Sequence, residues 1–344
     1  MHILQALDKP FHVSFEITNQ CNLRCDFCSA RLTECHRKDL STNEILKIIS
    51  ILASEEIFSI FLTGGEPFLR KDLPIIVKNC SDRGINVTLS TNGTTVTKEV
   101  AETISRSGLD EIQVSIHADN KVHDKMVGID GSIGNAMSGL ENLLSSGIKV
   151  TVASVVTRRN YNRLPSLVRK VAKMGVSYFR VLRLMPHSNK MLKDIVPYNE
   201  MESLVKELSK IEDELGNISI IVTSSPGFIE KFGEGRQQYK ILHPLCHTCT
   251  AGKMAMGILS DGNCVPCLEL RDAQFICGNI LQNSISNIWK SDQMSQLRSV
   301  LPNQYIGFCG KCEWKWSCYS ARCVAYNIGE NLFGDDVSCY FIKE

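Results

Sequence analysis

Three cysteines near the amino terminus have a spacing that suits a metal centre. Cys21, Cys25 and Cys28 lie within the stretch QCNLRCDFC, with no obvious fourth ligand beside them. A closed structural zinc site uses four protein ligands, and a disulfide framework uses an even number of cysteines. Three thiolates at these spacings can hold three irons of a [4Fe-4S] cube and leave the fourth iron open to an exogenous ligand. A zinc site completed by a distant ligand such as Cys35 or His36 is the alternative.

A second and larger group of cysteines lies toward the carboxy terminus. Ten of the fifteen cysteines fall between residues 246 and 339, among turns such as SDGN and GENLFGDD. Because no secretory signal pattern is present, we expect a cytoplasmic protein, in which cysteines serve as metal ligands or reactive thiols more often than as disulfides. The region shows little hydrophobic periodicity, so we expect it to lack a large apolar core and to be held together by metal.

The elements that must position the first three cysteines can be read from the segment 11–185. Apolar, β-branched runs alternate there with amphipathic stretches, and Ser41 with Glu44 has the pattern of a capping box. We expect strands at FHVSFEI, FSIFLT, INVTLST, EIQVSIH, KVTVASVV and YFRVLRL, and helices near 41–54, 72–83, 97–106, 132–146 and 161–174. Six strands that alternate with helices predict a parallel sheet, either doubly wound or curled into a partial barrel.

The loops after the first two expected strands carry residues suited to ligand binding. The three cysteines follow FHVSFEI, and LTGGEP ends the second strand. In parallel α/β folds, ligands bind where the carboxyl ends of the strands meet. Gly64 and Gly65 permit a close approach of the backbone, and Glu66 offers a carboxylate to an ammonium group. We therefore expect both loops to border one site.

The two loops together resemble the radical S-adenosylmethionine (SAM) superfamily. The pattern Cys-x3-Cys-x-aromatic-Cys, with Phe27 as the aromatic residue, is followed by LTGGEP. The resemblance covers about residues 11–185 and implies an α/β fold, a partial (β/α)6 TIM-like barrel. It also implies that the open iron binds the amino and carboxylate groups of SAM. An electron from the cube would then cleave SAM to a 5'-deoxyadenosyl radical, which abstracts a substrate hydrogen.

The same resemblance implies contacts to SAM. The segment with Gly64, Gly65 and Glu66 would hydrogen-bond the amino group of SAM, and Phe27 would lie beside the adenine. Ser90 and Asn92 in LSTNG and Ser115 in VSIHA would contact the ribose and the methionine part. An ordinary cap or turn is the alternative for each polar residue at a strand end.

One position departs from the family pattern. Related enzymes often have an arginine in the stretch after HD, where it can pair with the SAM carboxylate, but HDKMVG has Val127 at that place. Lys125, Arg158 or Arg183 are the candidates that could supply the charge instead. A solvated surface residue is the alternative for each of them.

The cysteines after residue 245 resemble the SPASM extension, a cysteine-rich domain that usually holds two auxiliary [4Fe-4S] clusters. The match covers about residues 246–344, although Cys318 and Cys323 enclose four residues where three are typical. By this resemblance the first auxiliary cluster would use Cys246, Cys249, Cys267 and Cys323, and the second Cys309, Cys312, Cys318 and Cys339. With the SAM-binding cube, three [4Fe-4S] clusters are expected. Cys264 is the nearest replacement for Cys246, and a pair of structural zinc sites is the alternative.

Four cysteines are left over, and three of them are candidate hydrogen donors. A redox-neutral epimerase needs a donor after hydrogen abstraction, and the weak S–H bond of a thiol suits that role. Cys264, Cys277 and Cys35 are the candidates, whereas a small buried side chain is the alternative for each. Cys80 completes the count.

The composition narrows the class of partner. The 38 basic and 37 acidic side chains nearly balance, and no apolar stretch approaches the length of a membrane span. We therefore expect neither nucleic acid nor a membrane as a partner, but a peptide or small-molecule substrate and an electron donor such as flavodoxin or ferredoxin.

The expected parts of the chain are an extension (1–10), the radical SAM core (11–185), a linker with a helix (186–245) and the SPASM domain (246–344).

Post-translational modification of a ribosomally made peptide is the leading prediction for function, by crosslinking, thioether formation or epimerisation. Dehydrogenation or epimerisation of a sugar, an aminocyclitol or another natural-product intermediate is the first alternative. It gains weight because only about ten residues precede the first strand, too few for an added peptide-binding domain. Sulfatase maturation is disfavoured, because Leu268 stands where an aspartate is expected. A non-catalytic iron–sulfur or zinc redox module is the alternative of another class.

Overall fold

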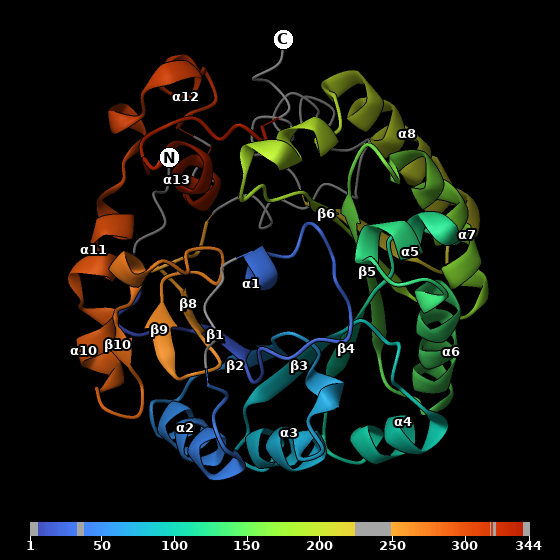
Figure 1. Ribbon diagram of the computed structural model, residues 1–344, viewed down its shortest axis with the longest axis horizontal. Helices are drawn as coiled ribbons and strands as arrows, with labels where there is room; N and C mark the ends of the chain where they lie inside the picture. Colours follow the sequence, from blue (N-terminus) through green and yellow to red (C-terminus); the bar gives the residue numbers. More distant parts are fainter. Residues whose placement is uncertain (1–5, 33–37, 224–248, 317, 319–320, 340–344) are drawn as a thin grey trace.

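A computed structural model describes residues 6–32, 38–223, 249–316, 318 and 321–339. In this part of the chain, ten strands form one sheet that curves into an open barrel, with helices on its outside (Figure 1). The strand order is β10-β9-β8-β1-β2-β3-β4-β5-β6-β7. The first six strands are β1 (His12–Glu16), β2 (Ser59–Thr63), β3 (Asn86–Thr91), β4 (Glu111–Ser115), β5 (Val150–Val156) and β6 (Tyr178–Arg183).

These six strands are the ones expected from the sequence, and neighbouring strands pair in parallel from β1 to β6. The helices between them are α2 (Thr42–Ser54), α3 (Leu73–Ser81), α4 (Lys98–Ser105), α5 (Lys121–Val127), α6 (Ser132–Ser145) and α7 (Leu164–Lys173). The capping box at Ser41 and Glu44 is present at the start of α2. The prediction of a partial α/β barrel is confirmed, while α5 was not expected.

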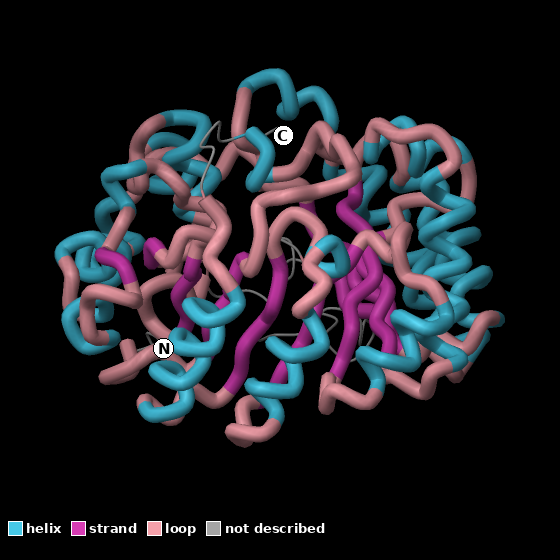
Figure 2. Tube along the Cα trace, turned by 60° about the horizontal axis from the view of Figure 1, so that its bottom comes forward, coloured by secondary structure: helices cyan, strands magenta, loops and turns pink. Residues whose placement is uncertain are grey.

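The segment 186–223 adds more than the linker and helix expected there. Helix α8 (Tyr198–Leu215) coincides with the expected helix, but a seventh strand, β7 (Ser219–Val222), follows it and pairs in parallel with β6. Apolar side chains of α8 such as Leu204 and Leu208 are buried. Figure 2 shows the helices outside the wall of strands.

Alternation along strands such as β1 separates an outer apolar face from an inner face that carries polar side chains. In β1, Val13 and Phe15 are fully buried in the core, while His12, Ser14 and Glu16 line an internal cavity. A period of two is what a strand needs to present different chemistry to its two faces. The outer face therefore packs against helices, and the inner face is left for a ligand.

The cysteine-rich region continues the sheet on its other side. Strand β8 (Ala255–Ile258) pairs in parallel with β1, and β9 (Asn263–Val265) and β10 (Gly278–Asn279) follow in antiparallel pairing. The expectation that this region lacks a large apolar core is wrong. Trp289 is 1% exposed and packs in the main core, and Phe275 belongs to a second apolar cluster formed within the region.

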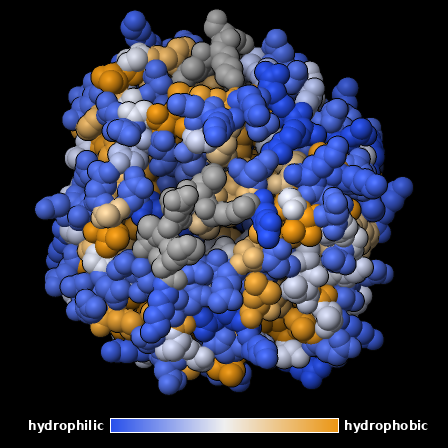
Figure 3. Space-filling view, viewed as in Figure 1, coloured by the Kyte–Doolittle hydropathy of each residue, from blue (hydrophilic) through white to orange (hydrophobic). Residues whose placement is uncertain are grey.

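Short helices complete the described structure. They are α1 (Ser29–Leu32), α10 (Ile285–Trp289), α11 (Asp292–Ser299), α12 (Gly307–Lys311) and α13 (Arg322–Gly329), with 3-10 turns at Pro67–Leu69, Tyr161–Arg163, Asn189–Asp194, Ala273–Phe275 and Pro302–Gln304. The face seen in Figure 3 is mostly hydrophilic, with scattered hydrophobic side chains. Among the described helices, none has the length and apolar character that crossing a membrane requires.

Candidate active site

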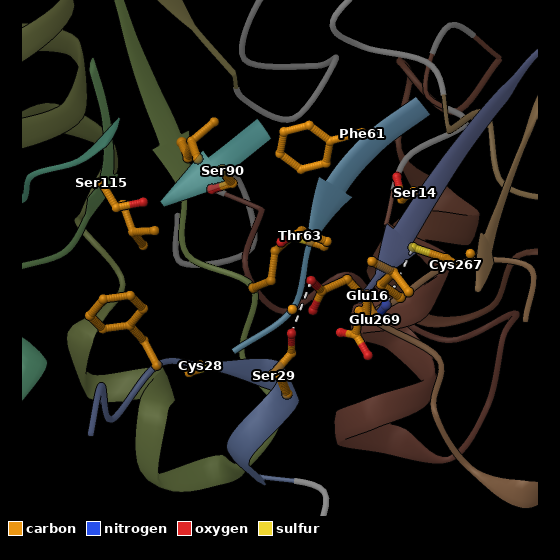
Figure 4. Close-up of a pocket in the computed structure, with 18 of the residues that line it drawn as sticks. Ser14, Glu16, Cys28, Ser29, Phe61, Thr63, Ser90, Ser115, Cys267 and Glu269 are labelled. Atoms are coloured by element: carbon orange, nitrogen blue, oxygen red, sulfur yellow. Dashed lines mark hydrogen bonds between the residues drawn. The ribbon is translucent and has the colours of Figure 1, made fainter. Parts of the chain in front are cut away.

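A cavity of about 790 Å³ lies inside the barrel and is bordered by strands, by the loop after β1 and by the cysteine-rich region. Figure 4 shows Ser14, Glu16, Thr63, Ser90 and Ser115 around it, with Cys28 and Ser29 on one side and Cys267 and Glu269 on another. The wall therefore combines polar strand residues with cysteines from both ends of the chain.

Cys21, Cys25 and Cys28 all line this cavity. Burial raises the pKa of the Cys25 thiol to about 12, and the charges of Cys28 and Cys21 contribute in the same direction. Mutual repulsion of this kind requires the three sulfurs to be close to one another. The three thiols thus meet at the edge of an open space, which suits a cluster with one position free for a ligand. Cys35 and His36 lie outside the described residues.

The two glycines of LTGGEP let β2 end against the cysteine loop. A Cβ atom on Gly65 would lie 2.0 Å from the carbonyl oxygen of Gln20, and one on Gly64, where φ is +145°, would lie 2.3 Å from the carbonyl oxygen of Thr18. The backbone N–H of Gly65 donates to Thr18 O at 2.8 Å, and that of Glu66 donates to Gln20 O at 2.7 Å. Glycine is required here because no side chain fits between the two segments.

The Glu66 carboxylate is occupied by hydrogen-bond donors of the protein itself. It is 1% exposed and accepts hydrogen bonds from the Thr91 hydroxyl at 2.7 Å, the Asn92 N–H at 2.7 Å and the Phe68 N–H at 3.1 Å. Among the described residues that line the cavity are Gly64 and Gly65, but not Glu66. Its carboxylate therefore joins the ends of β2 and β3, and an ammonium contact is left to the backbone of this segment.

The other residues expected to contact SAM lie at the cavity. Phe27, Ser90, Asn92 and Ser115 all line it. The Asn92 amide also donates to Asn22 Oδ1 at 2.9 Å, which links the end of β3 to the stretch between Cys21 and Cys25. The arrangement leaves the hydroxyls of two neighbouring strands, β3 and β4, within reach of a bound molecule.

His117, in the stretch VSIHA, is a cavity residue that sequence reasoning missed. Its ring meets Phe27 edge to face, with centroids 4.9 Å apart, and burial lowers its pKa to about 3. Its Nδ1 accepts the N–H of Val155 at 3.2 Å, so the neutral ring carries its proton on Nε2. His117 thus fixes Phe27 in place. Its position as the last residue of the expected strand EIQVSIH was the available signal.

The three basic residues predicted as partners of the SAM carboxylate do not all lie at the cavity. Val127 is buried and lines the cavity, and its carbonyl oxygen accepts the N–H of Arg24 at 2.8 Å. Of the three candidates, only Arg183 lines the cavity, and its guanidinium pairs with Asp336 at 2.9 Å. Lys125 and Arg158 are exposed. Arg183 is therefore the candidate that the structure supports best.

The first predicted auxiliary ligand set converges at the same cavity. Cys249, Cys267 and Cys323 all line it. A hydrogen bond between the Cys267 and Cys323 thiols lowers the pKa of Cys267 and raises that of Cys323, and the charge of Cys249 acts on Cys323 as well. The fold thus brings three thiols together, although Cys323 lies more than fifty positions along the chain from the other two cysteines. Cys246, the fourth predicted ligand, lies outside the described residues.

The second predicted set lies around α12 and the segment after α13. Burial raises the pKa of Cys312, and the nearby charge of Cys318 adds to this effect. The sulfur of Cys309 accepts the N–H of Asp336 at 3.4 Å, and Cys339 donates its own N–H to Asp336 O at 2.8 Å. The Asp336 backbone therefore ties the Cys309 and Cys339 segments together.

Two of the predicted hydrogen donors, Cys264 and Cys277, lie away from the cavity. Cys264 is fully buried in β9 within the apolar core, and Cys277 is half-buried, with burial raising its pKa to about 11. Neither sulfur is among the described groups that line the cavity, although a donor must face the substrate. The prediction for Cys35 falls outside the described residues. Cys80 is fully buried in the core.

A polar network that sequence reasoning missed connects the two ligand regions. Glu269 accepts a hydrogen bond from the Ser29 hydroxyl at 3.3 Å and contacts His187 Nε2 at 2.6 Å. The Asn327 amide donates both to Glu269 O at 3.1 Å and to His187 Nδ1 at 2.9 Å, so the proton of a neutral His187 is on Nε2 and points to Glu269. Ser29 directly follows Cys28, and Glu269 follows Cys267 by two residues, which was the only signal in the sequence.

Arg271 anchors the same wall to β1. Its guanidinium forms a two-point ion pair with Glu16, in which one hydrogen bond measures 2.9 Å, and both side chains are buried. Among the residues that the structure describes, no three His, Cys, Asp or Glu side chains stand close enough to hold a single metal ion.

Comparison with known proteins agrees with these features. A model of the radical SAM superfamily matches residues 15–180, and a model of an iron–sulfur cluster-binding domain, SPASM, matches residues 246–313. The AdoMet-dependent heme synthase of Nitratidesulfovibrio vulgaris is 24% identical over 96% of this chain and 92% of its own length. The mycofactocin maturase MftC of Mycolicibacterium smegmatis is 28% identical over 97% of this chain and 84% of its own.

A solved structure has a fold similar to that of this chain. Streptococcus suis SuiB bound to S-adenosylmethionine has a TM-score of 0.78 and is 17% identical, over 97% of this chain and 78% of SuiB.

Proposed function

The chain is an enzyme of the radical SAM superfamily with a SPASM domain, and from this premise we propose that it cleaves SAM reductively and abstracts a hydrogen from a substrate in the barrel cavity. The meeting of Cys21, Cys25 and Cys28 at the open side of that cavity carries the proposal. These thiols would hold a [4Fe-4S] cluster, which when bound supplies the electron that cleaves SAM and a free iron site for its methionine part.

The chain's own residues would hold SAM between the strand ends. Phe27, fixed by His117, offers an aromatic face to the adenine. Ser90 and Ser115 offer hydroxyls to the ribose and the methionine part, and the backbone of Gly64 and Gly65 can approach the amino group closely. Arg183 is the proposed partner of the carboxylate, although it must share its charge with Asp336. Asn92, in addition, ties this edge to the cysteine loop.

We assign two further [4Fe-4S] clusters to the SPASM domain, which makes three in total. Cys249, Cys267 and Cys323, completed by Cys246, would hold the cluster that borders the cavity. The set of Cys309, Cys312, Cys318 and Cys339 would hold the other. A fully ligated cluster cannot bind SAM, but it can exchange electrons and shape the substrate pocket. The domain boundary near residue 246 is part of this proposal.

A ribosomally made peptide is the substrate class we propose. Its support is the similarity over most of the chain to a relative named a maturase, together with a cavity of about 790 Å³ whose strand wall carries both polar and apolar side chains. A small molecule is the second candidate, because a relative of similar identity is named a heme synthase. A redox partner such as flavodoxin or ferredoxin would supply the electron in either case.

Anaerobic cluster reconstitution and product analysis test this function. We expect about 12 irons per chain for three four-iron clusters, and formation of 5'-deoxyadenosine from SAM under reducing conditions. Changing Cys25→Ala should abolish SAM cleavage, because it removes a ligand of the SAM-binding cluster. Changing Cys318→Ala should lower the iron content by about four but spare much of the cleavage.

The matched pair of variants separates the two kinds of site. If Cys25→Ala and Cys318→Ala abolished 5'-deoxyadenosine formation equally, the assignment of distinct SAM-binding and auxiliary ligands would be wrong. Failure of the reconstituted wild-type enzyme to cleave SAM would contradict the proposed function as a whole. Transfer of deuterium from a labelled candidate peptide into 5'-deoxyadenosine would identify the peptide class, and transfer from a labelled small molecule the alternative.

A further inference from the structure

Arg322 carries a buried positive charge and lies between the two sets of cysteines that are the predicted cluster ligands of the SPASM domain. It is 4% exposed, and its Nη2 donates to the sulfur of Cys309 at 3.8 Å. Its Nη1 donates to the carbonyl oxygens of Gly334 at 2.7 Å and Leu332 at 3.3 Å. The carbonyl contacts hold the guanidinium so that one edge remains directed at the sulfur.

An aromatic ring fixes the face of the same guanidinium. The carbon atom of the Arg322 guanidinium lies 4.3 Å from the centroid of the Tyr305 ring, and Tyr305 is itself buried. Burial raises the pKa of the Tyr305 hydroxyl, and the charges of Cys318, Cys309 and Cys249 add to the effect. The Tyr305 and Arg322 pair is therefore within electrostatic reach of cysteines from both predicted ligand sets.

The chain positions Arg322 at this place through its neighbour Cys323. Residue 322 begins helix α13, and Cys323, in the same turn, belongs to the first ligand set. The positive charge of Arg322 acts to lower the pKa of Cys249, in the first set, and of Cys309, in the second. One buried cation thus interacts with sulfur ligands of both sets.

A fixed cation beside a cluster changes its redox behaviour. Each one-electron reduction adds a negative charge to the cluster, and a nearby positive charge stabilises that added charge, more strongly in a site of low dielectric. Hydrogen bonds from N–H groups to ligand sulfurs act in the same direction, because they are stronger to the more negative state. Both effects make a cluster easier to reduce.

We propose that Arg322 is a positioning residue that raises the reduction potentials of the auxiliary clusters, most strongly that of the cluster held by Cys309, Cys312, Cys318 and Cys339. The proposal rests on the proposed function, since it assumes two auxiliary clusters. It extends that function by naming the group that makes the SPASM domain suitable as an electron acceptor. The SAM-binding cluster, held by a different part of the chain, should be unaffected.

Equilibrium reduction of the reconstituted holoenzyme, followed by electron paramagnetic resonance, tests the proposal. We compare wild type with Arg322→Met, which removes the charge and the donor, and with Arg322→Lys, which keeps the charge. The expected result is a shift of an auxiliary-cluster midpoint potential to a more negative value in Arg322→Met and a smaller shift in Arg322→Lys. The signal that changes on addition of SAM identifies the SAM-binding cluster, whose potential should not move.

Arg298→Met is the matched control. Arg298 also stacks on an aromatic ring, with its guanidinium carbon 4.5 Å from the Trp289 centroid, and it also donates to a backbone carbonyl, that of Gly252. The cysteine charge that acts on it is that of Cys277, which belongs to neither ligand set. Its replacement should leave all cluster potentials unchanged, which separates a local electrostatic effect from a general loosening of the domain.

The iron content distinguishes the outcomes. Unchanged potentials in Arg322→Met, with wild-type iron content, would overturn the inference and leave the proposed function intact. If Arg322→Met loses iron, the iron content of Arg322→Lys distinguishes a tuning role from a structural one. Loss of iron in both variants would overturn the tuning role in favour of a structural one. A wild-type enzyme with only about four irons would overturn the two auxiliary clusters themselves.

Discussion

Glu66 is a buried carboxyl group whose surroundings act in opposite directions. Burial disfavours the ionised form and raises its pKa to about 7, although donors from Asn92, Thr91 and Phe68 oppose the shift. The folded state therefore binds more protons than the unfolded state between pH 4.5, the ordinary value, and about 7. The contribution of Glu66 to stability is fully present below this window and is lost as the pH rises through it.

This residue gives the first prediction at the residue scale. In Glu66→Gln the titration is absent, while the amide group faces the N–H of Asn92 and adds a penalty that does not depend on pH. From pH 5 to pH 8, the stability of wild type relative to the variant should fall by about 2 to 3 kcal/mol. Urea unfolding of the metal-free, reduced protein at both pH values measures it. A difference that stays constant would mean that Glu66 is ionised throughout.

At the scale of elements, the carboxyl end of β2 and the cysteine loop form one unit because two glycines let their backbones touch. Replacing Gly65→Ala places a Cβ 2.0 Å from the Gln20 carbonyl oxygen, so the loop must shift. We expect loss of the SAM-binding cluster, with about four fewer irons per chain and no 5'-deoxyadenosine, while the auxiliary clusters remain. Iron analysis and the cleavage assay measure both effects.

Gly134→Ala is the control for this prediction. Gly134 lies within helix α6, and a Cβ there would meet no atom within 4 Å. Because alanine is a better helix former, this variant should load a full complement of iron and be stabilised by roughly 0.5–1 kcal/mol. Equal iron content in Gly65→Ala and Gly134→Ala would show that the cysteine loop does not depend on the close approach of β2.

The elements themselves could largely be predicted from the sequence, because periodicity is a local property. The six strands of the core and the helix at 198–215 follow from it. Strand β7 was missed because it is only four residues long, and β8, AMGI, because it has few β-branched residues and is defined by its pairing with β1. Long-range pairing leaves no periodic signal.

The residues of the candidate site also divide into those that a local motif predicts and those that only the folded chain brings together. The motifs with Cys25 and Gly65 lie within single loops, so their position at the cavity could be predicted. The contact between His187 and Glu269 joins residues 82 positions apart. Only the folded chain brings such a pair together, and the donors that occupy Glu66 likewise come from a different strand, β3.

For the whole molecule, the barrel and the cysteine-rich region are parts of one sheet. Strand β8 pairs with β1, and the Trp289 indole donates to the carbonyl oxygen of Leu7 at 2.8 Å. The buried ion pairs of Arg271 with Glu16 and of Arg183 with Asp336 cross the same boundary. The region from β8 onward therefore depends on the barrel for its packing, whatever clusters it holds.

Continuity of the sheet predicts that both parts unfold together. All three tryptophans, at positions 289, 314 and 316, lie in the cysteine-rich region, whereas helices α2 to α8 of the barrel dominate the far-ultraviolet circular dichroism. In the metal-free, reduced protein, tryptophan fluorescence and circular dichroism should give coincident urea transitions. Separate transitions would show that the two parts are independent.

Glu16→Ala should shift both transitions together, because it leaves the buried Arg271 guanidinium without its two-point partner. Removing one member of a buried pair costs about 3–5 kcal/mol. The exposed pair of Lys78 and Asp82, with N···O at 2.9 Å, provides the control, and Asp82→Ala should cost less than about 1 kcal/mol. If Glu16→Ala moved only the fluorescence transition, the ion pair would stabilise the cysteine-rich region alone. A common shift places its effect on the shared sheet, where β1 carries both Glu16 and the loop of Cys21, Cys25 and Cys28.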